Sequence, residues 1–290
     1  MKKVLITGKN SYIGTSFKNW LMKEPNKYEV YEIDLKNDAW KEKSFNGYDV
    51  LFHVAGIAHV SSDPKLEALY YKVNRDLTIE TAEKAKVDGV KQFIFMSSII
   101  VYGDSYEVRK IIDKDTIPAP SNFYGDSKLQ AENGIRHLES KDFKIVILRP
   151  PMIYGKGSRG NYTKLSALAK KVPIFPDIDN QRSMLHIDNL CEHIKLIIDN
   201  DEEGIFFPQN TDYVKTSEMV KLISEVNGKS IILTKKFNYI LKKISGRTPL
   251  FNKIFGNLAY DKDMSKYKKK YQIRNLRESI LLTELEKREL

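Results

Sequence analysis

Disulfides and membrane spans are both excluded by what this chain of 290 residues lacks. Its single cysteine, Cys191, cannot form an internal disulfide, which suits a reducing cytosol. No apolar run approaches the ~18 residues that a membrane-spanning helix requires. The first apolar stretch, Val4–Ile6, is too short for the core of a signal peptide and is more typical of a strand. We therefore expect a cytoplasmic globular protein, with Cys191 packed in the core rather than acting as a nucleophile.

Acidic residues are scarce in the segment 229–277. It contains 14 Lys/Arg and only two acids, Asp261 and Asp263, so it carries a charge of +12, and the rest of the chain is near −2. Such a segment can attract a nucleotide diphosphate, a nucleic acid or an anionic membrane. The helical spacing of Phe237, Ile240, Leu241 and Ile244 favours a simpler interpretation, in which the lysines form the solvated side of a packed helix. No nucleic-acid-binding motif accompanies the charge, so we expect no nucleic-acid partner and at most peripheral membrane binding.

Short apolar runs alternate with longer stretches of helical period through the first half of the chain. This pattern is typical of βαβ units on a parallel sheet. Strands are expected at Val4–Thr7, Glu29–Ile33, Val50–Val54, Gln92–Ser97 and Lys144–Leu148. Helices are expected at Tyr12–Lys23, Pro64–Ala85, Asn122–Glu139, Asp188–Ile198 and Glu218–Asn227. The sequence predicts an α/β protein: a Rossmann-type doubly wound parallel sheet in residues 1–150, and a smaller C-terminal substrate-binding domain in residues 151–290, some segments of which return to the sheet.

A glycine turn joins the first expected strand to the first expected helix. Gly8 permits a tight turn, and Gly14 lets the helix approach the sheet closely. Ser11 stands where a middle glycine is usual. Backbone N–H groups at a helix N-terminus bind a pyrophosphate well. The expected cofactor contacts of this turn are Gly8, Asn10, Ser11, Tyr12, Ile13 and Gly14.

Asp34 ends the second expected strand. A carboxylate in this place bonds the adenine-ribose hydroxyls and repels a 2′-phosphate, which favours NAD. Lys9 and Lys36 could each pair with a 2′-phosphate, and Asp34 could simply open a turn. The sequence therefore predicts NAD and leaves NADP open.

Two later strands end in small or polar residues. His53 precedes Val54, Ala55 and Gly56, which would leave room for the cofactor to pass over the strand end. His53 lies within the strand, so we interpret it as a packed histidine rather than a base. Ser98 follows the next strand, where it could bond the oxygen at the reacting carbon or merely cap its own loop.

Tyr124 and Lys128 are four residues apart, which places both side chains on one face of a helix. A free tyrosine titrates near ~10, but a neighbouring cation favours the phenolate, so such a pair can move a proton during a hydride transfer. The same spacing recurs at Tyr106/Lys110 and Tyr239/Lys243. What distinguishes Tyr124 is its position after a nucleotide-type turn and a strand that ends in serines.

These segments, in this order, resemble the extended short-chain dehydrogenase/reductases that act on nucleotide sugars. The matching parts are the Gly8–Gly14 turn, His53–Gly56, Asn74, Ser98 with Val101–Gly103, Tyr124 with Lys128, Arg149-Pro150, and Arg182 with His186–Leu190. The resemblance implies that Ser98, Tyr124 and Lys128 are the catalytic set, with Tyr124 and Lys128 also touching the cofactor. It implies that Asn74 supports the backbone near the nicotinamide, and that Ser98, Asn161 and Arg182 bind the nucleotide sugar. A homodimer through the helix that carries Tyr124 is a further expectation, and no metal site is expected.

One departure from the family pattern narrows the reaction. In the family that this chain resembles, the sugar 4,6-dehydratases have an Asp-Glu pair just after the serine or threonine. Ile99 and Ile100 occupy these positions here, and their side chains cannot exchange protons. Segments 150–155, 160–162 and 180–183 look most like those of enzymes that reduce 4-keto-6-deoxy-N-acetylhexosamines on UDP, for surface polysaccharide. We therefore expect an NAD(P)-dependent 4-keto-sugar reductase. A UDP-sugar 4-epimerase with tightly bound NAD shares the same residues and stays an alternative. A non-catalytic dinucleotide-binding regulator is a third, although such proteins typically lack the tyrosine or the lysine.

Overall fold

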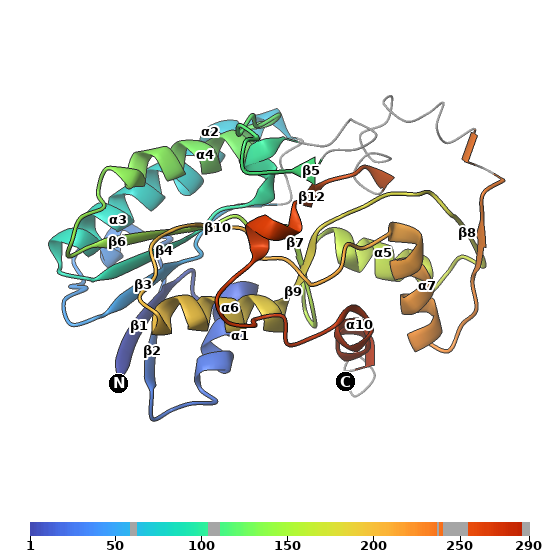
Figure 1. Cartoon of the computed structure of the whole chain (residues 1–290). Helices are drawn as coiled ribbons and strands as arrows, with labels where there is room; N and C mark the ends of the chain where they lie inside the picture. Colours follow the sequence, from blue (N-terminus) through green and yellow to red (C-terminus); the bar gives the residue numbers. More distant parts are fainter. Residues whose placement is uncertain (59–62, 104–110, 237, 240–254, 286–290) are drawn as a thin grey trace. The chain divides into compact units, whose positions relative to one another are not determined.

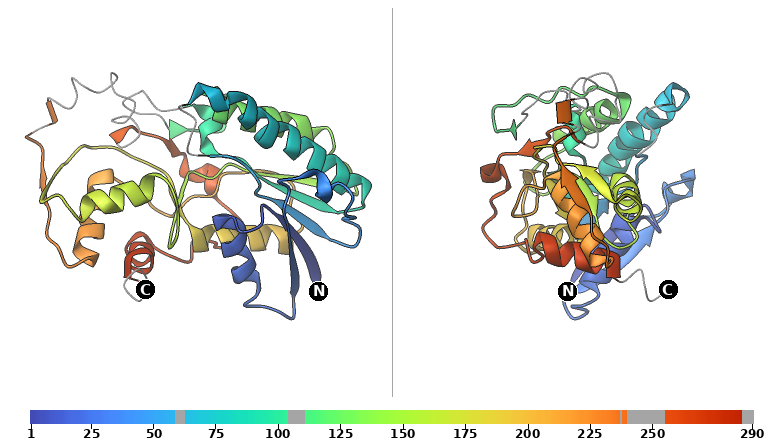
Figure 2. Two further views of the ribbon diagram at one scale, coloured as in Figure 1. Left: turned by 180° about the vertical axis from the view of Figure 1, so that it is seen from behind. Right: turned by 90° about the vertical axis from the view of Figure 1, so that its right-hand side faces the viewer.

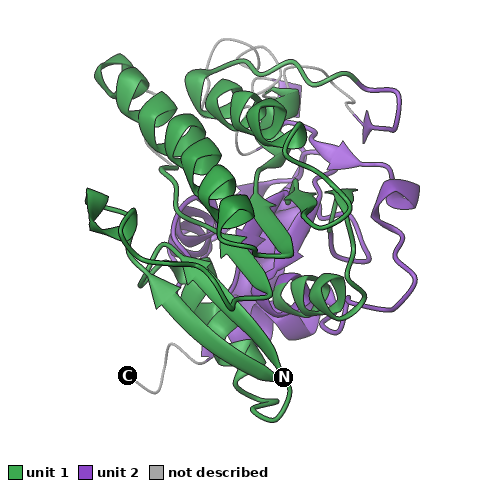
Figure 3. Cartoon of the chain, turned by 90° about the vertical axis from the view of Figure 1, so that its left-hand side faces the viewer, with its two compact units in different colours: residues 1–103, 117–150, 191–208 green, residues 104–116, 151–190, 209–290 purple. Residues whose placement is uncertain are grey.

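The computed structural model describes residues 1–58, 63–103, 111–236, 238–239 and 255–285. They form two compact units, which Figure 3 colours separately: residues 1–103, 117–150 and 191–208 make the first, and residues 104–116, 151–190 and 209–290 the second. Most of the helix expected around Phe237–Ile244 lies outside the described residues, as do Tyr106, Lys110 and Lys243. The division falls at Pro150, but 191–208 belongs to the first unit and 104–116 to the second.

The first unit is built on a parallel sheet with the strand order β10-β6-β4-β3-β1-β2. The strands are β1 (Lys2–Thr7), β2 (Tyr28–Ile33), β3 (Val50–His53), β4 (Gln92–Met96), β6 (Lys144–Leu148) and β10 (Gly204–Phe206). The chain places β2 on one side of β1 and β3 on the other, so the topological switch point, where ligands of such sheets bind, lies between β1 and β3. Beyond β2 no further strand forms, because the polar segment that follows makes only a short 3₁₀ turn, η1 (Asp38–Trp40).

Helices cover both faces of this sheet (Figures 1 and 2). Helices α3 (Leu77–Val87) and α4 (Phe123–Arg136) lie on one face, where Ala82 and Ala131 pack against Phe93 and other strand residues. Helix α1 (Tyr12–Leu21) lies on the other face, and its Phe17 ring meets Phe52 of β3 edge to face at 5.2 Å. The Trp20 indole at the end of α1 donates to Glu192 of α6 (Ile187–Asp199) at 3.0 Å. The predicted Rossmann-type doubly wound sheet is confirmed.

The single helix expected over Pro64–Ala85 is wrong in one respect. The structure divides it into a 3₁₀ turn η2 (Pro64–Leu66), helix α2 (Glu67–Tyr70), a π-helical segment η3 (Tyr71–Asp76) and α3. A π turn inserts one extra residue into the helical repeat, and such bulges are frequent at functional sites. The residue buried within η3 is Asn74, a polar side chain that the bulge turns toward the protein interior.

The second unit consists of short strand pairs and helices. The pairs are β7 (Met152–Tyr154) with β9 (Met184–His186), β8 (Ile174–Pro176) with β11 (Ile232–Thr234), and β5 (Ile111–Ile112) with β12 (Ala259–Tyr260). The helices are α5 (Asn161–Ala169), α7 (Thr216–Val226) and α10 (Leu276–Leu285), with a 3₁₀ turn η5 at Lys262–Ser265. Among the described residues of both units, no helix is long and apolar enough to cross a bilayer.

A buried carboxylate holds the helices of the second unit together. Glu284 of α10 accepts hydrogen bonds from Tyr162 (3.0 Å) and Ser166 (2.8 Å) of α5, and pairs with Lys170 at 2.6 Å. Its other oxygen accepts from the Asn227 amide, just after α7, at 3.2 Å. Because its side chain is fully buried, these partners replace the water that the carboxylate loses on folding.

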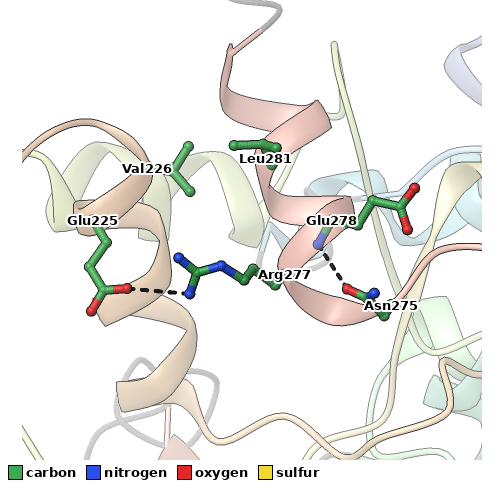
Figure 4. A pocket seen from close by; sticks show the side chains of 6 residues that line it. All are labelled: Glu225, Val226, Asn275, Arg277, Glu278 and Leu281. Carbon is green, nitrogen blue, oxygen red and sulfur yellow. Dashed lines mark hydrogen bonds and ion pairs between the residues drawn. The ribbon is translucent and has the colours of Figure 1, made fainter.

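The pocket drawn in Figure 4 also lies within the second unit. It has a volume of about 370 Å³ and opens between the end of α7 and the start of α10. Its lining residues are Glu225, Val226, Asn275, Arg277, Glu278 and Leu281. None of them belongs to the predicted site, which has to be built from other side chains.

Candidate active site

The glycine turn after β1 has the geometry that its two glycines require. Gly8 has a φ of +76°, and a Cβ there would lie 3.1 Å from the backbone nitrogen of Ala55. A Cβ on Gly14 would lie 2.7 Å from the Ser11 hydroxyl and 3.2 Å from Ile6. Ser11 itself caps helix α1, since its hydroxyl accepts from the Gly14 N–H at 3.1 Å. The serine in the middle position therefore has a structural role that a glycine could not fill.

The start of α1 suits a diphosphate. The first N–H groups of a helix have no intrahelical acceptor and lie at the positive end of the helix dipole. No acidic residue occupies the first turn of α1 to compete for them, and Tyr12 and Ile13 supply N–H groups there. Asn10 adopts a left-handed φ of 63°, which tightens the loop before the helix. The residues present therefore fit a dinucleotide, and Asn10–Gly14 would hold its diphosphate.

Asp34 is exposed just beyond β2. The preference for NAD over NADP, which rests on this carboxylate, stays a prediction. Its carboxylate accepts from the backbone N–H of Lys36 at 3.0 Å, and the Lys36 ammonium lies 4.0 Å away. The turn-opening role is thus present, and the Lys36 ammonium lies beside the second carboxylate oxygen.

His53 is packed inside the sheet and is not placed as a base. Its Nδ1 lies 3.1 Å from the Thr7 hydroxyl and its Nε2 3.1 Å from the Thr78 hydroxyl. Thr78 donates its own proton to the carbonyl of Asn74 at 2.8 Å, so it accepts from Nε2–H, and Nδ1 accepts from Thr7. Burial, with a smaller contribution from the charge of Lys128, lowers the pKa of His53 to about 3. The imidazole is therefore neutral and in one tautomer at physiological pH.

Asn74 holds the backbone just beyond β3. Its side-chain oxygen accepts from the Ile57 N–H at 2.8 Å, and its amide donates to the Ile57 carbonyl at 3.1 Å and to Ser127 of α4 at 3.2 Å. A Cβ on the exposed Gly56 would lie 3.0 Å from the Asn74 oxygen and 3.2 Å from the Lys128 ammonium. Asn74, Gly56 and Lys128 therefore meet at one point, in line with the backbone-supporting role expected of Asn74. Whether this point faces the nicotinamide stays a prediction.

Ser98 and Tyr124 are brought together at the carboxyl end of β4. The Ser98 hydroxyl accepts from the Ile100 N–H at 3.3 Å, so it caps the 3₁₀ turn η4 (Ile99–Tyr102), and it also hydrogen-bonds the Tyr124 side chain. Lys128, one turn along α4, donates to the carbonyl of Met96 at 2.9 Å and lies 4.7 Å above the Phe95 ring. Ser98 and Tyr124 are only partly buried, whereas Lys128 is 5% exposed. The two residues predicted to touch substrate are thus less enclosed than the cation.

The sequence predicts that Lys128 lowers the pKa of Tyr124, but in the structure this pKa is raised. Burial raises the pKa of Tyr124 to about 12; the hydrogen bond with Ser98 lowers it, and nearby Tyr70 raises it. Burial likewise lowers the pKa of Lys128 to about 8, against the raising effect of Glu132. Desolvation outweighs attraction here because the Lys128 ammonium is enclosed and directed at Met96. At neutral pH the phenol is protonated.

Asn161 and Arg182 belong to the second unit. Asn161 is exposed at the first position of α5, after Gly160. Arg182 is held by backbone hydrogen bonds to Val214, and its guanidinium donates to the carbonyl of Gly256 at 3.0 Å. Their assignment as substrate contacts stays a prediction.

Comparison with known proteins identifies the family. The model of the NAD dependent epimerase/dehydratase family matches residues 4–207. The chain belongs to this family. A UDP-glucose 4-epimerase of Vibrio cholerae is 31% identical over 245 residues, which cover 76% of this chain and 74% of that protein. A GDP-6-deoxy-D-mannose reductase of Pseudomonas aeruginosa is 23% identical over 252 residues, covering 78% and 80%.

Solved structures of the family share the fold of this epimerase/dehydratase-family chain. A UDP-glucuronic acid 4-epimerase of Bacillus cereus, in complex with a fluorinated UDP-sugar and NAD, superimposes with a TM-score of 0.77. It is 18% identical, and the match covers 99% of each chain. Membership of the family makes this protein an NAD(P)-dependent enzyme.

Sequence reasoning missed a buried ion pair beside the expected catalytic set. Glu132 follows Lys128 by one helical turn, and its carboxylate is bound by the guanidinium of Arg149. The spacing of Tyr124, Lys128 and Glu132, four residues each, could have shown that all three share one face of α4. An acidic residue on the inward face of a helix needs a buried partner, and Arg149 directly follows the expected strand Lys144–Leu148.

Proposed function

We propose that this protein catalyses oxidation or reduction at C4 of a nucleotide-activated sugar, with a UDP-N-acetyl-amino sugar as the leading class. The proposal depends on one observation: Tyr124 is hydrogen-bonded to Ser98 and only partly buried, one helical turn from the enclosed Lys128. This is the arrangement that proton transfer to or from a sugar oxygen requires. Family members named as nucleotide-sugar epimerases and reductases support the substrate class.

The chain supplies the proton and its positioning, and NAD(P), when bound, would supply or accept the hydride at C4. Because the pKa of Tyr124 is raised to about 12, its phenol is protonated at neutral pH and suited to donate to the oxygen of a 4-keto group. Ser98 orients that oxygen and the phenol together. The Lys128 charge stabilises the phenolate that proton donation leaves behind, and the lack of a side chain at Gly56 lets this ammonium lie close to the backbone beyond β3.

Two directions of this chemistry are open, each with its own support. The protonated phenol and the resemblance of segments 150–155, 160–162 and 180–183 favour a 4-keto-sugar reductase that makes surface polysaccharide precursors. The Vibrio cholerae relative, 31% identical, favours a UDP-sugar 4-epimerase, which would oxidise and then reduce C4 with one retained NAD. A third reaction of the family, dehydration, is disfavoured because Ile99 and Ile100 replace the acid pair that it requires.

A paired assay tests the proposal. Purified protein is given a UDP-4-keto-N-acetylhexosamine with NADH or NADPH, and separately UDP-GlcNAc or UDP-glucose without added cofactor. Consumption of one cofactor per sugar supports the reductase. Interconversion of C4 epimers without net cofactor consumption supports the epimerase. If neither sugar is converted while cofactor binding is intact, the proposed function is wrong.

The substrate contacts proposed in the second unit are tested by binding. Arg182→Ala should weaken UDP-sugar binding, measured by calorimetry, while the affinity for NAD(H) changes little, because a guanidinium suits a diphosphate. Asn161→Ala should have a smaller effect of the same kind. A loss of NAD(H) affinity with intact UDP-sugar binding would remove Arg182 from the substrate site.

A further inference from the structure

The inward face of helix α4 carries an acid as well as the expected catalytic pair. Tyr124, Lys128 and Glu132 follow one another at intervals of four residues. The Glu132 side chain has no exposed surface. A bare carboxylate in such a place would be strongly destabilising, so its partners must provide what water would.

Those partners come from two other elements of the first unit. The Arg149 Nε lies 3.0 Å from Glu132 Oε1, and its Nη2 bonds Oε2, which makes a bidentate pair between side chains no more than 4% exposed. Ser97 donates its hydroxyl to the same Oε1. Arg149 uses its remaining Nη1 to donate to the Tyr102 hydroxyl at 2.7 Å.

This hydrogen-bond network binds residues on both sides of Ser98 in the chain. Ser97 immediately precedes Ser98, and Tyr102 ends the η4 turn that Ser98 caps. Ser97 hydrogen-bonds Glu132 directly, and Tyr102 is joined to Glu132 through Arg149. Glu132 belongs to the same helix as Tyr124 and Lys128. A bidentate guanidinium–carboxylate pair fixes distance and orientation at once.

We propose that Glu132, through its buried pair with Arg149, is a positioning residue that fixes the Ser98 turn against helix α4, one helical turn from Lys128. The inference rests on the proposed function for its catalytic meaning. Neither Glu132 nor Arg149 touches the reacting atoms in this account; both act through Ser98, Tyr124 and Lys128.

Charge as well as geometry is involved, because several ionisable groups surround Lys128. Tyr124 and Glu132 lie on its own helix, His53 is on β3, and Arg149 follows β6. His53 is neutral, and Arg149 adds a second buried cation. Arg136 approaches Glu132 at 3.8 Å from the half-exposed rim. Glu132 is thus the anion that offsets the two enclosed cations.

The test removes both charges at once. A single Glu132→Gln or Arg149→Met change leaves a buried charge without its partner, so the fold itself suffers. The double variant Glu132→Gln with Arg149→Met leaves no buried charge unpaired, because Arg136 is half-exposed, and the glutamine can still accept from Ser97. The titration of Lys128 is followed by NMR on lysine labelled with ¹³C at Cε, with the resonance assigned from Lys128→Arg. The control removes the matched pair of the second unit, Glu284→Gln with Lys170→Met.

We expect the double variant to melt closer to the wild type than either single variant, with the pKa of Lys128 below the wild-type value and turnover reduced at least about tenfold. The control should leave the Lys128 titration unchanged. A folded double variant that retains the wild-type Lys128 titration overturns the charge role. Absence of sugar turnover in the wild type would defeat the proposed function but leave this titration decisive.

Arg149→Lys separates position from charge and covers the case in which the double variant does not fold. A lysine retains the charge and loses the bidentate geometry. We expect unchanged Lys128 titration with reduced kcat. Wild-type kcat in folded Arg149→Lys would overturn the positioning role.

Discussion

Glu132 in the first unit and Glu284 in the second are both carboxylates with no exposed side-chain surface. Each forms a close ion pair with one cation and accepts from at least one hydroxyl group of a neighbouring element. Glu132 is bound by Arg149, which is 4% exposed, and its helical neighbours are the expected catalytic residues. Glu284 is bound by Lys170, which is 32% exposed, and its hydroxyl partners are Tyr162 and Ser166 of helix α5.

With Glu132 as a positioning residue, a buried carboxylate paired with a cation has two different roles in this protein, one in catalysis and one in stability. In the second unit, the buried carboxylate joins three helices, and its cation reaches the surface, where water shares the charge. In the first unit, cation and anion are both enclosed beside a lysine whose pKa burial has already lowered to about 8. Charge removed from the first network should therefore change chemistry, whereas charge removed from the second should change stability alone.

Each unit also contains a hydrogen-bonded tyrosine, Tyr124 in the first and Tyr162 in the second, and exchanging their hydroxyls for hydrogen should give the largest contrast. Tyr124→Phe removes the proton donor, so turnover should fall by ~10² to 10⁴ while the melting temperature and NAD(H) binding stay near wild type. Tyr162→Phe removes a hydrogen bond to Glu284, and should cost about 1 kcal/mol of unfolding free energy with little change in turnover. Steady-state kinetics and urea denaturation of both variants measure the contrast. Near-normal turnover in Tyr124→Phe would refute the catalytic assignment.

The same contrast explains what could be predicted from the sequence. The sheet and the Gly8–Gly14 turn were predictable because apolar runs and glycines act locally, through strand propensity and backbone freedom. Ser98 hydrogen-bonds Tyr124, and Lys128 reaches the carbonyl of Met96, because the carboxyl end of β4 and the first turns of α4 are adjacent in this fold. That these three residues form the catalytic set stays a prediction.

What could not be predicted depends on distant partners. The π segment at Tyr71–Asp76 has no sequence period of its own. Its Asn74 side chain is held by hydrogen bonds to Ile57 and Ser127, which are distant in the sequence. The Glu132–Arg149 pair joins two residues that each look solvated in the sequence. The direction of the Tyr124 pKa was mistaken because spacing reports a neighbouring cation and does not report desolvation. In the second unit, strands of two or three residues are too short for any pattern.

Single substitutions at the two carboxylates should differ in stability. Glu132→Gln leaves the enclosed Arg149 unpaired, so a loss of about 3–5 kcal/mol is expected. Glu284→Gln leaves a lysine that can turn toward water, so a loss of about 1–3 kcal/mol is expected. Urea denaturation of both variants at pH 7 gives the two values. Equal losses would show that enclosure of the cation does not distinguish the networks.

Acid should act on the second network below the ordinary carboxyl range. Although burial raises the pKa of Glu284, hydrogen bonds from Lys170 and its other partners outweigh it and leave the pKa below its ordinary value of 4.5. A lowered folded pKa contributes stability above the unfolded pKa, and that contribution is lost as pH falls through the folded pKa. The wild type should therefore lose stability below about pH 4.5, and Glu284→Gln should lose less over the same range. A fluorescence-monitored denaturation series from pH 6 to pH 3 compares them; parallel curves would contradict the assignment.

The first unit should respond to much milder acid, with the smallest effect per substitution. Burial lowers the pKa of both His53 and His193 from 6.5 to about 3. An unfolded histidine gains its proton near pH 6.5, whereas these two stay neutral in the fold, so their stability contribution is lost as pH falls from about 6.5 toward 3. Each should add at most about 1.4 kcal/mol of lost stability per pH unit in that window.

His53→Gln can satisfy one of the two threonine hydroxyls and does not titrate, so it should remove about half of this slope between pH 6.5 and pH 5. The matched control is His137→Gln, which removes an exposed histidine of the same unit. Unfolding free energies from urea denaturation at pH 7, 6 and 5 supply the slopes. If His53→Gln retained the full slope, the proton would be taken up elsewhere, and the early acid response could not be assigned to the histidine that joins Thr7 to Thr78.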